Sequence, residues 1–150
     1  MTRSEKAAEF FLSGYNCAQS VTMAFAKELG MEEKTAAKIA SGFGGGFGRQ
    51  REVCGAVSGM VMVASYLYGY DTPNQEQQAA CYQMVQSLCK EFEAQTGSII
   101  CREILKNPPS DPNPTPRNAE FYAKRPCARM VFTAAALLDR FMEANPLEER

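Results

Sequence analysis

Apolar side chains recur every three or four residues along most of this chain, and polar residues fill the positions between them. This period is that of one face of an amphipathic α-helix, and no stretch shows the apolar–polar alternation of a half-buried strand. Two clear runs lie near opposite ends of the chain: Ala18, Val21, Phe25 and Leu29, and Met130, Ala134, Leu137, Leu138 and Phe141. The pattern predicts an all-α protein, a helical bundle of about six to seven helices.

Capping residues indicate where the first helices begin. Thr2 and Glu5 have the spacing of a capping box, and so do Asn16 and Gln19. Such a box satisfies the free N–H groups at a helix start, so these residues favour two helices close to the N-terminus. The expected helices cover residues 2–13, 16–29, 32–40, 54–67, 72–95 and 98–106, and a last helix begins at residue 126.

The later helices carry similar signals. Thr72 is expected to cap the helix at 72–95, with Pro73 in its first turn, and Ser98 is expected to cap the helix at 98–106. Gly69 and Gly97 stand where two helices should stop. Residues 107–118 contain five prolines and predict an extended, proline-rich strap instead of regular structure.

A single helical domain over residues 1–150 is the expected organisation. The chain has 150 residues and 45% hydrophobic content, which is enough for one real core. The strap at 107–118 is interpreted as part of this domain and not as a linker, because the roughly thirty residues after it cannot form a core alone. It should wrap the surface and return the last helix to the bundle.

A glycine-rich loop precedes the most apolar helix. It contains Gly46 among five glycines within residues 42–48. Two interpretations are left open: a tight turn that packs two helices closely, or a cluster of bare N–H groups that favours an anion or a thiolate. Arg49 and Arg51 follow; they could bind an anion or neutralise a reduced cluster, but an exposed, solvated position is the preferred expectation. Gly55 and Gly59 share one helix face and predict close approach of another backbone.

Charge and hydropathy restrict the partners. Lys and Arg total 16 and Asp and Glu total 17, so there is no electrostatic reason to expect nucleic acid or an anionic membrane. The apolar run at 53–67 is short and rich in small residues, so we expect a buried helix and no membrane span. The N-terminus lacks the apolar segment of a signal peptide, which predicts a cytoplasmic protein. A homo-oligomer is left open.

Six cysteines and no histidine are the unusual features of the composition. Without histidine, Ser-His-Asp and Cys-His mechanisms are excluded, and a transition-metal site would be built chiefly from thiolates. Cys81 and Cys89 lie inside a predicted helix and are interpreted as small buried hydrophobic residues. The other four each fall in the first turn of a predicted helix, where N–H groups and the helix dipole favour a thiolate: Cys17, Cys54, Cys101 and Cys127.

These four cysteines resemble the framework of the C_GCAxxG_C_C family of redox-active proteins. The resemblance rests on Cys17 in GYNCAQSV, the segment from Cys54 to Gly59, Cys101 in GSIICREI and Cys127 in RPCARMV. The order here is Cys-Gly-Ala-x-x-Gly, whereas the family label places a glycine before the cysteine. The resemblance covers nearly the whole chain. It implies a helical redox or metal-binding protein, and it names a site without naming a substrate or reaction.

The first hypothesis for function is an electron-transfer or redox-sensing protein with an iron–sulfur cluster, most simply [2Fe–2S]. The metal ligands would be the four cysteines of the framework, and backbone amides near Gly46, Gly55 and Gly59 would surround the cofactor. A redox partner protein is implied and not identified.

Two alternatives need no iron–sulfur cluster. A metal-free thiol–disulfide protein would cycle two of the four cysteines between dithiol and disulfide, with Cys17 and Cys54 as the expected redox thiols. A non-catalytic helical binding module would hold zinc with all four thiolates as a structural staple. The residues alone do not decide among the three, and whether the protein is an enzyme stays open.

Overall fold

The all-α prediction is confirmed. A computed structural model describes residues 1–147, and every regular secondary-structure element in that range is a helix. The helices are α1 (Arg3–Leu12), α2 (Cys17–Ala24), α3 (Ala26–Leu29), α4 (Glu33–Ala40), η1 (Ser41–Phe43), α5 (Gly44–Phe47), α6 (Gly55–Tyr68), α7 (Gln75–Thr96), α8 (Cys101–Ile104), α9 (Ala119–Lys124) and α10 (Cys127–Ala144). The helices are more numerous than the six to seven expected, because several connections between the long helices contain short helices. The single domain stays a prediction, and its last three residues lie outside the described range.

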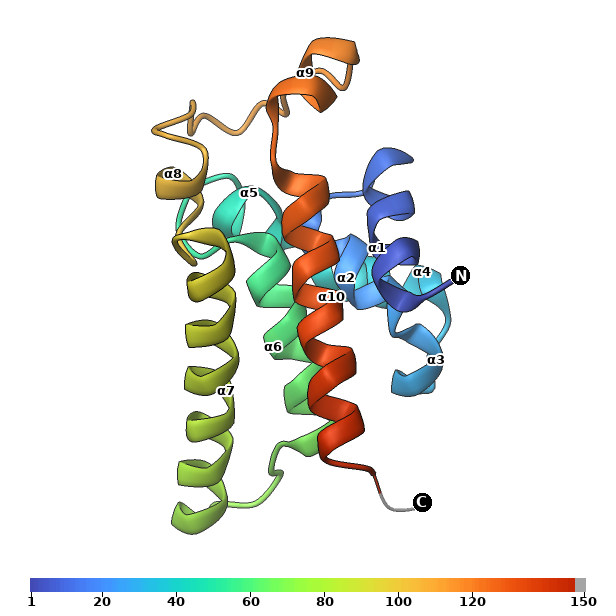
Figure 1. The fold of residues 1–150 in the computed structure, drawn as a ribbon, viewed down its shortest axis with the longest axis vertical. Coiled ribbons are helices and arrows are strands. Elements are labelled where there is room, and N and C mark those ends of the chain that lie inside the picture. Colours follow the sequence, from blue (N-terminus) through green and yellow to red (C-terminus); the bar gives the residue numbers. More distant parts are fainter. Residues whose placement is uncertain (148–150) are drawn as a thin grey trace.

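The long helices α6, α7 and α10 run along the length of the molecule, and α1 to α4 pack on one side of α10 (Figure 1). Helix α10 contacts α1, α2, α6 and α7, which places its apolar face at the centre of the bundle. The largest fully buried side chains come from several of these helices: Phe11, Phe25, Met60, Leu88, Phe92, Leu137 and Leu138. Helix α6 is buried as expected. Within residues 1–147 no helix combines the length and apolar character needed to cross a membrane.

The capping residues near the N-terminus act as the sequence predicts. Thr2 accepts a hydrogen bond from the backbone N–H of Glu5, and the Asn16 side chain accepts one from Gln19, with the reciprocal bonds also formed. These local contacts fix where α1 and α2 begin. Because α2 begins directly after Asn16, the next residue stands at the helix N-terminus.

Two of the predicted caps are wrong. Helix α7 is capped by Asn74 and not by Thr72, because the Asn74 side chain accepts the hydrogen bond from the Gln77 N–H at 2.9 Å. Ser98 does not cap a helix over 98–106. Its hydroxyl accepts from the N–H of Ile100 at 3.0 Å, and α8 covers only Cys101–Ile104. A local turn therefore replaces most of the expected helix.

Gly55 and Gly59 bring α6 into close contact with α2, as predicted. A Cβ atom at Gly59 would lie 2.9 Å from the carbonyl oxygen of Ala18, and one at Gly55 would lie 3.1 Å from the Cβ of Cys17. No larger side chain fits at this distance without movement of a helix. The two glycines therefore set the spacing between the helix starts that carry Cys17 and Cys54.

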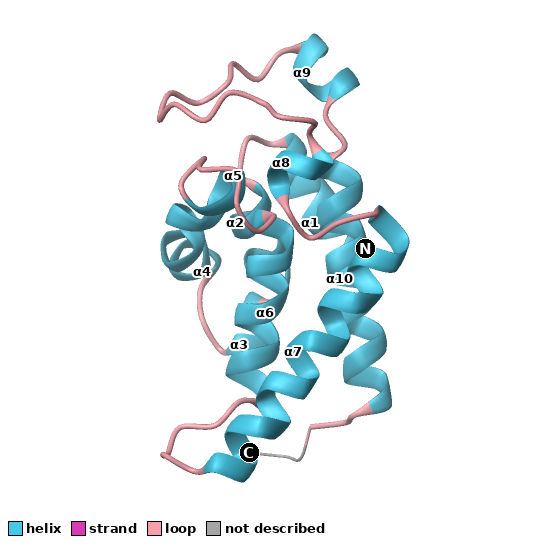
Figure 2. Cartoon of the chain, turned by 90° about the vertical axis from the view of Figure 1, so that its left-hand side faces the viewer, coloured by secondary structure: helices cyan, strands magenta, loops and turns pink. Residues whose placement is uncertain are grey.

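The proline-rich strap crosses one end of the molecule and leads into α9, a short helix that the sequence did not predict (Figure 2). Arg117 fastens the end of the strap to α1. Its guanidinium donates hydrogen bonds to the carbonyl oxygens of Phe11 and Tyr15, both at 2.9 Å, and lies 4.5 Å from the centre of the Phe11 ring. The strap returns the chain to the bundle at Cys127, as expected.

Candidate functional site

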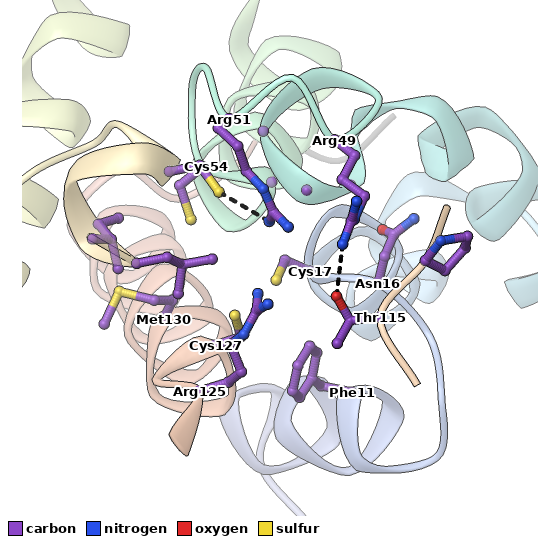
Figure 3. Close-up of a pocket in the computed structure, with 18 of the residues that line it drawn as sticks. Phe11, Asn16, Cys17, Arg49, Arg51, Cys54, Thr115, Arg125, Cys127 and Met130 are labelled. Carbon is purple, nitrogen blue, oxygen red and sulfur yellow. Dashed lines mark hydrogen bonds between the residues drawn. The ribbon is translucent and has the colours of Figure 1, made fainter. Parts of the chain in front are cut away.

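Four cysteines, each at a helix start, line one cavity. Cys17, Cys101 and Cys127 are the first residues of α2, α8 and α10, and Cys54 is the N-cap of α6. All four border a cavity of about 340 Å³ at the end of the bundle under the strap (Figure 3). The structure thus brings together the set that the sequence singled out, and the roles of its members stay a prediction.

Backbone hydrogen bonds hold two of the four starts side by side. The N–H of Cys54 donates to the carbonyl of Ile99 at 2.7 Å, and the N–H of Cys101 donates to the carbonyl of Glu52 at 2.6 Å. Val53 and Ile100 form an isolated antiparallel bridge in the same place. These contacts join segments nearly 50 residues apart in the sequence, which helical periodicity does not predict.

Cys81 and Cys89 lie elsewhere. Both are half-buried on α7, pack against the apolar core, and are not among the residues that line the cavity. Their position agrees with the interpretation of both as structural thiols.

Cys17 and Cys127 are in hydrogen-bond contact with each other. The Cys17 thiol donates to the sulfur of Cys127, which raises the pKa of Cys17 well above its usual value, with burial acting in the same direction. The same hydrogen bond lowers the pKa of Cys127, and the positive charges of Arg125, Arg117 and Arg51 add to it against the effect of burial. Cys127 is therefore the more acidic thiol of the pair, and Cys17 is the one that keeps its proton to higher pH.

Cys54 is a neutral thiol at ordinary pH. Burial raises its pKa to about 12, although the backbone N–H groups of Ala56 and Val57 partly oppose this. The N–H groups at a helix start stabilise a thiolate enough only when solvent or a nearby positive charge adds to their effect. Cys54 is only 6% exposed, so solvent contributes little. The sequence expectation that each helix start favours a thiolate is thus wrong at Cys17, Cys54 and Cys101, whose pKa values are all raised.

Arg51 is buried, contrary to the expectation of an exposed side chain. It is 4% exposed, donates to the carbonyl of Pro109 at 2.9 Å, and lies with one guanidinium nitrogen 3.6 Å from the sulfur of Cys101. Arg49 also lines the cavity and donates to the hydroxyl of Thr115 at 2.8 Å. Both arginines point inward because the strap covers them, and the strap position is not evident from local sequence.

Two further arginines at the cavity were not singled out from the sequence. Arg117 enters from the strap, and Arg125 enters from the residues that precede α10. Arg125 precedes Cys127 by two residues, and this proximity is the only sequence signal that was available. The cavity therefore combines four thiols with four cationic side chains.

The glycine-rich loop forms a left-handed turn. Its residues with positive φ are Gly45 (64°), Gly46 (73°), Phe47 (69°), Gly48 (60°) and Arg49 (65°). The N–H groups of Arg51 and Glu52 donate to the carbonyls of Gly45 and Gly46 at 3.1 and 2.9 Å. The carbonyl groups of the loop thus accept hydrogen bonds from the residues that follow it, which supports the tight-turn interpretation.

The three glycines proposed as cofactor neighbours differ in position. Gly46 and Gly55 line the cavity, whereas Gly59 packs against α2 and is not among the lining residues. A Cβ atom at Gly46 would lie 2.6 Å from the Cβ of Cys101 and 2.8 Å from the Cα of Arg51. Gly46 therefore permits the approach of α8 to the loop.

Replacing Arg51 by methionine should raise the pKa of Cys101. Burial already raises that pKa, and the Arg51 guanidinium opposes the shift through its hydrogen bond and charge. Losing a hydrogen bond to a charged group should reduce the thiolate fraction of Cys101 roughly tenfold. The Cβ chemical shift of Cys101, followed by NMR from pH 7 to 11, measures the change. Arg51→Lys should restore part of the effect, and an unchanged titration in Arg51→Met would contradict the assignment.

The cysteines around the cavity are the right type of residue for a sulfur-ligated metal centre, but they are not close enough together to form one. Four thiols line the cavity, and no carboxylate is found among the described residues around it. Across residues 1–147, however, no three Cys, Asp or Glu side chains come together in an arrangement able to hold a metal ion. This conformation does not present a formed metal site.

Comparison with known proteins finds a matching family model. A family model described as "Putative redox-active protein (C_GCAxxG_C_C)" matches residues 15–141, a range that contains all four cavity cysteines. No curated protein and no solved structure matches the chain.

Proposed function

The chain belongs to the C_GCAxxG_C_C family of redox-active proteins, and from this premise we propose that Cys17 and Cys127 cycle between a dithiol and a disulfide. The observation that carries the proposal is the placement of both thiols on one cavity, where each shifts the pKa of the other. Exchange requires one thiolate to attack and a second thiol within reach to resolve the product, and the lowered pKa of Cys127 and its interaction with Cys17 support these two residues for those roles.

The reaction begins at the Cys127 sulfur. This thiolate attacks one sulfur of an oxidised substrate's disulfide, forms a mixed disulfide and releases the first substrate thiolate. Cys17 then loses its proton, attacks the Cys127 sulfur, forms the Cys17–Cys127 bond and releases the second substrate thiolate. The protein loses two electrons, and the substrate gains them as two thiols. A redox partner protein, expected in the cytoplasm, would return the pair to the dithiol.

An exchange between Cys17 and Cys54, the pair expected from the sequence, stays a prediction. The high pKa of Cys54 makes its sulfur a weak nucleophile at neutral pH. Cys54 is therefore poorly suited to attack the substrate first. It would serve better in a later exchange that forms a disulfide between Cys54 and Cys127.

Mapping of the disulfide tests the proposal. Reduced protein is oxidised under anaerobic conditions with one equivalent of hydroxyethyl disulfide, and free thiols are alkylated before peptide mass spectrometry. We expect one predominant cross-link, Cys17 to Cys127. In Cys17→Ser, the mixed disulfide should accumulate on Cys127, whereas Cys89→Ser should leave the native cross-link unchanged. A predominant bridge between other residues, or no specific bridge, would refute the proposal.

A second candidate is an iron–sulfur centre held by Cys17, Cys54, Cys101 and Cys127. It is supported by the gathering of all four thiols on one cavity, with Gly46 and Gly55 beside them. Binding would require the thiols to move closer together than they are here. The cluster would supply one-electron transfer, and the four cysteines would hold it.

Metal and sulfide analysis of anaerobically purified protein separates the candidates. A cluster requires iron, acid-labile sulfide and visible absorbance, all lost when the cavity cysteines are replaced by serine. One equivalent of zinc, with loss of helicity in chelator, would instead favour the zinc-stapled module. Protein that is free of metal and still forms the Cys17–Cys127 bridge would exclude both metal proposals.

A further inference from the structure

The cavity carries an excess of positive charge. Arg49, Arg51, Arg117 and Arg125 line it, and no aspartate or glutamate is found among the described residues that do so. The protein as a whole is nearly neutral, with a formal net charge of −1. The four arginines are therefore concentrated at one place by the fold.

Most of this charge is not neutralised by ion pairs. Arg49 lies 3.3 Å from the exposed carboxylate of Asp111 at the edge of the strap. Arg51 and Arg117 donate hydrogen bonds to carbonyl oxygens, and also to the Cys101 sulfur and the Tyr122 hydroxyl, so no carboxylate cancels their charge. Among the described residues, the Arg125 side chain has no ion pair and no hydrogen bond, and its guanidinium lies 5.2 Å from the centre of the Phe121 ring.

The Arg125 guanidinium lies near the Cys127 sulfur. Figure 3 shows the side chains of Arg125 and Cys127 close together at the cavity, with Cys17 beside them and Arg51 entering from the opposite side. One thiolate at Cys127 offsets only part of the positive charge. The cavity volume of about 340 Å³ falls at the small end of the range for small-molecule sites.

We propose that this cavity is a binding site for a small dicarboxylate disulfide, whose carboxylates contact Arg125 and the neighbouring arginines while its sulfurs face Cys127. The proposal rests on the dithiol function proposed above and names its substrate class. Guanidinium groups bind carboxylates in a planar, two-point geometry, and a site of one charge sign raises the local concentration of the opposite sign.

The electrons follow the same steps as before. The Cys127 thiolate takes one sulfur of the bound disulfide and releases a thiolate that carries one carboxylate. Cys17 then closes the Cys17–Cys127 bond and releases the second carboxylate-bearing thiolate. The two products and the proton lost by Cys17 leave the cavity, and no other oxidant is required.

Three small disulfides of different charge test the proposal: the dianion dithiodipropionate, neutral hydroxyethyl disulfide and the dication cystamine. The rate of Cys17–Cys127 bond formation is measured with each disulfide at low salt. To correct for the intrinsic reactivity of each disulfide, this rate is divided by the rate at which the same disulfide reacts with a neutral reference thiol, N-acetylcysteine amide. We expect the dianion to exceed the neutral probe by at least roughly tenfold, and the dication to be slower than both. Adipate, a dianion without sulfur, should inhibit the reaction with the neutral probe.

Arg125→Gln should remove most of this preference. Because Arg125 also lowers the pKa of Cys127, the readout is the ratio of dianion to neutral rates, in which the change in thiolate fraction cancels. The matched control is Arg129→Gln on the exposed side of α10, whose guanidinium donates to the carbonyl of Gln95 outside the cavity. This control should keep the native ratio.

The outcomes distinguish the two proposals. If the Cys17–Cys127 bond forms equally fast with all three probes, or if the ratio is the same in Arg125→Gln as in the native chain, the dicarboxylate site is wrong and the dithiol function stands. If none of the probes produces that bond, the dithiol function fails, and the substrate proposal fails with it.

Discussion

Replacing Gly46 by alanine should destabilise the protein by roughly 2–5 kcal/mol, and should alter the surroundings of Cys101. The residue has a φ of 73°, where a side chain costs about 1–2 kcal/mol. The new methyl group would also lie 2.6 Å from the Cβ of Cys101 and 2.8 Å from the backbone N of Glu52. The Glu52 N is a backbone atom and the Cys101 Cβ is attached directly to the backbone, so neither moves away easily and overpacking adds roughly 1–3 kcal/mol. Urea unfolding measures the loss.

Two glycines in the same loop provide matched controls. Gly48 has a φ of 60°, but a Cβ there would meet only the carbonyl oxygen of Gly42 at 3.7 Å. Gly48→Ala should therefore show the conformational cost alone, about 1–2 kcal/mol. A Cβ at Gly42 meets nothing within 4 Å, and Gly42→Ala should be close to neutral. Equal losses at Gly46 and Gly48 would show that contact with Cys101 is not limiting.

Alkaline pH should destabilise the protein through Cys54 by about 4 kcal/mol in total. Burial raises the folded-state pKa from 9.0 to about 12, so the thiol ionises first in the unfolded chain. The stabilisation is fully present below pH 9 and is lost as the pH rises toward 12, by about 1.4 kcal/mol per pH unit. Urea unfolding at pH 8, 9, 10 and 11 measures this slope.

Substitution of Cys54 isolates its part of the alkaline effect, because Cys17, Cys101 and Tyr68 also have raised pKa values. Cys54→Ala and Cys54→Ser should both show a shallower loss of stability above pH 9. Since alanine and serine differ in polarity but neither titrates there, agreement between them assigns the effect to the thiol. Slopes parallel to the native one would contradict a buried neutral Cys54.

Local features of the sequence predicted the helices and the position of their starts. Capping at Thr2 and Asn16 depends on residues three positions away, and the hydrophobic face of α10 depends on residues within one helix. The position of four cysteines at helix starts followed from these local signals. The failure at Thr72 has the same origin, because Asn74 is a competing cap two residues later.

The electrostatics of the site could not be predicted in this way. Arg51 is buried because a strap that begins more than 50 residues later accepts its hydrogen bond at Pro109. The contact between Cys17 and Cys127 joins the second helix to the last one, and no local pattern pairs them in preference to Cys54. The charge and pairing of these groups depend on tertiary packing. The helical periodicity of a single sequence does not reveal such contacts.

The distance in sequence between Cys17 and Cys127 links the oxidation state of the pair to the stability of the whole chain. A bond between α2 and α10 would close a loop of roughly 100 residues. In the chain-entropy model, such a cross-link lowers the conformational entropy of the unfolded ensemble and so stabilises the folded state by about 4–5 kcal/mol. By thermodynamic linkage, folding favours the cross-link by the same amount. The oxidised protein would then resist unfolding and proteolysis more than the reduced one, so that cellular lifetime would follow redox state.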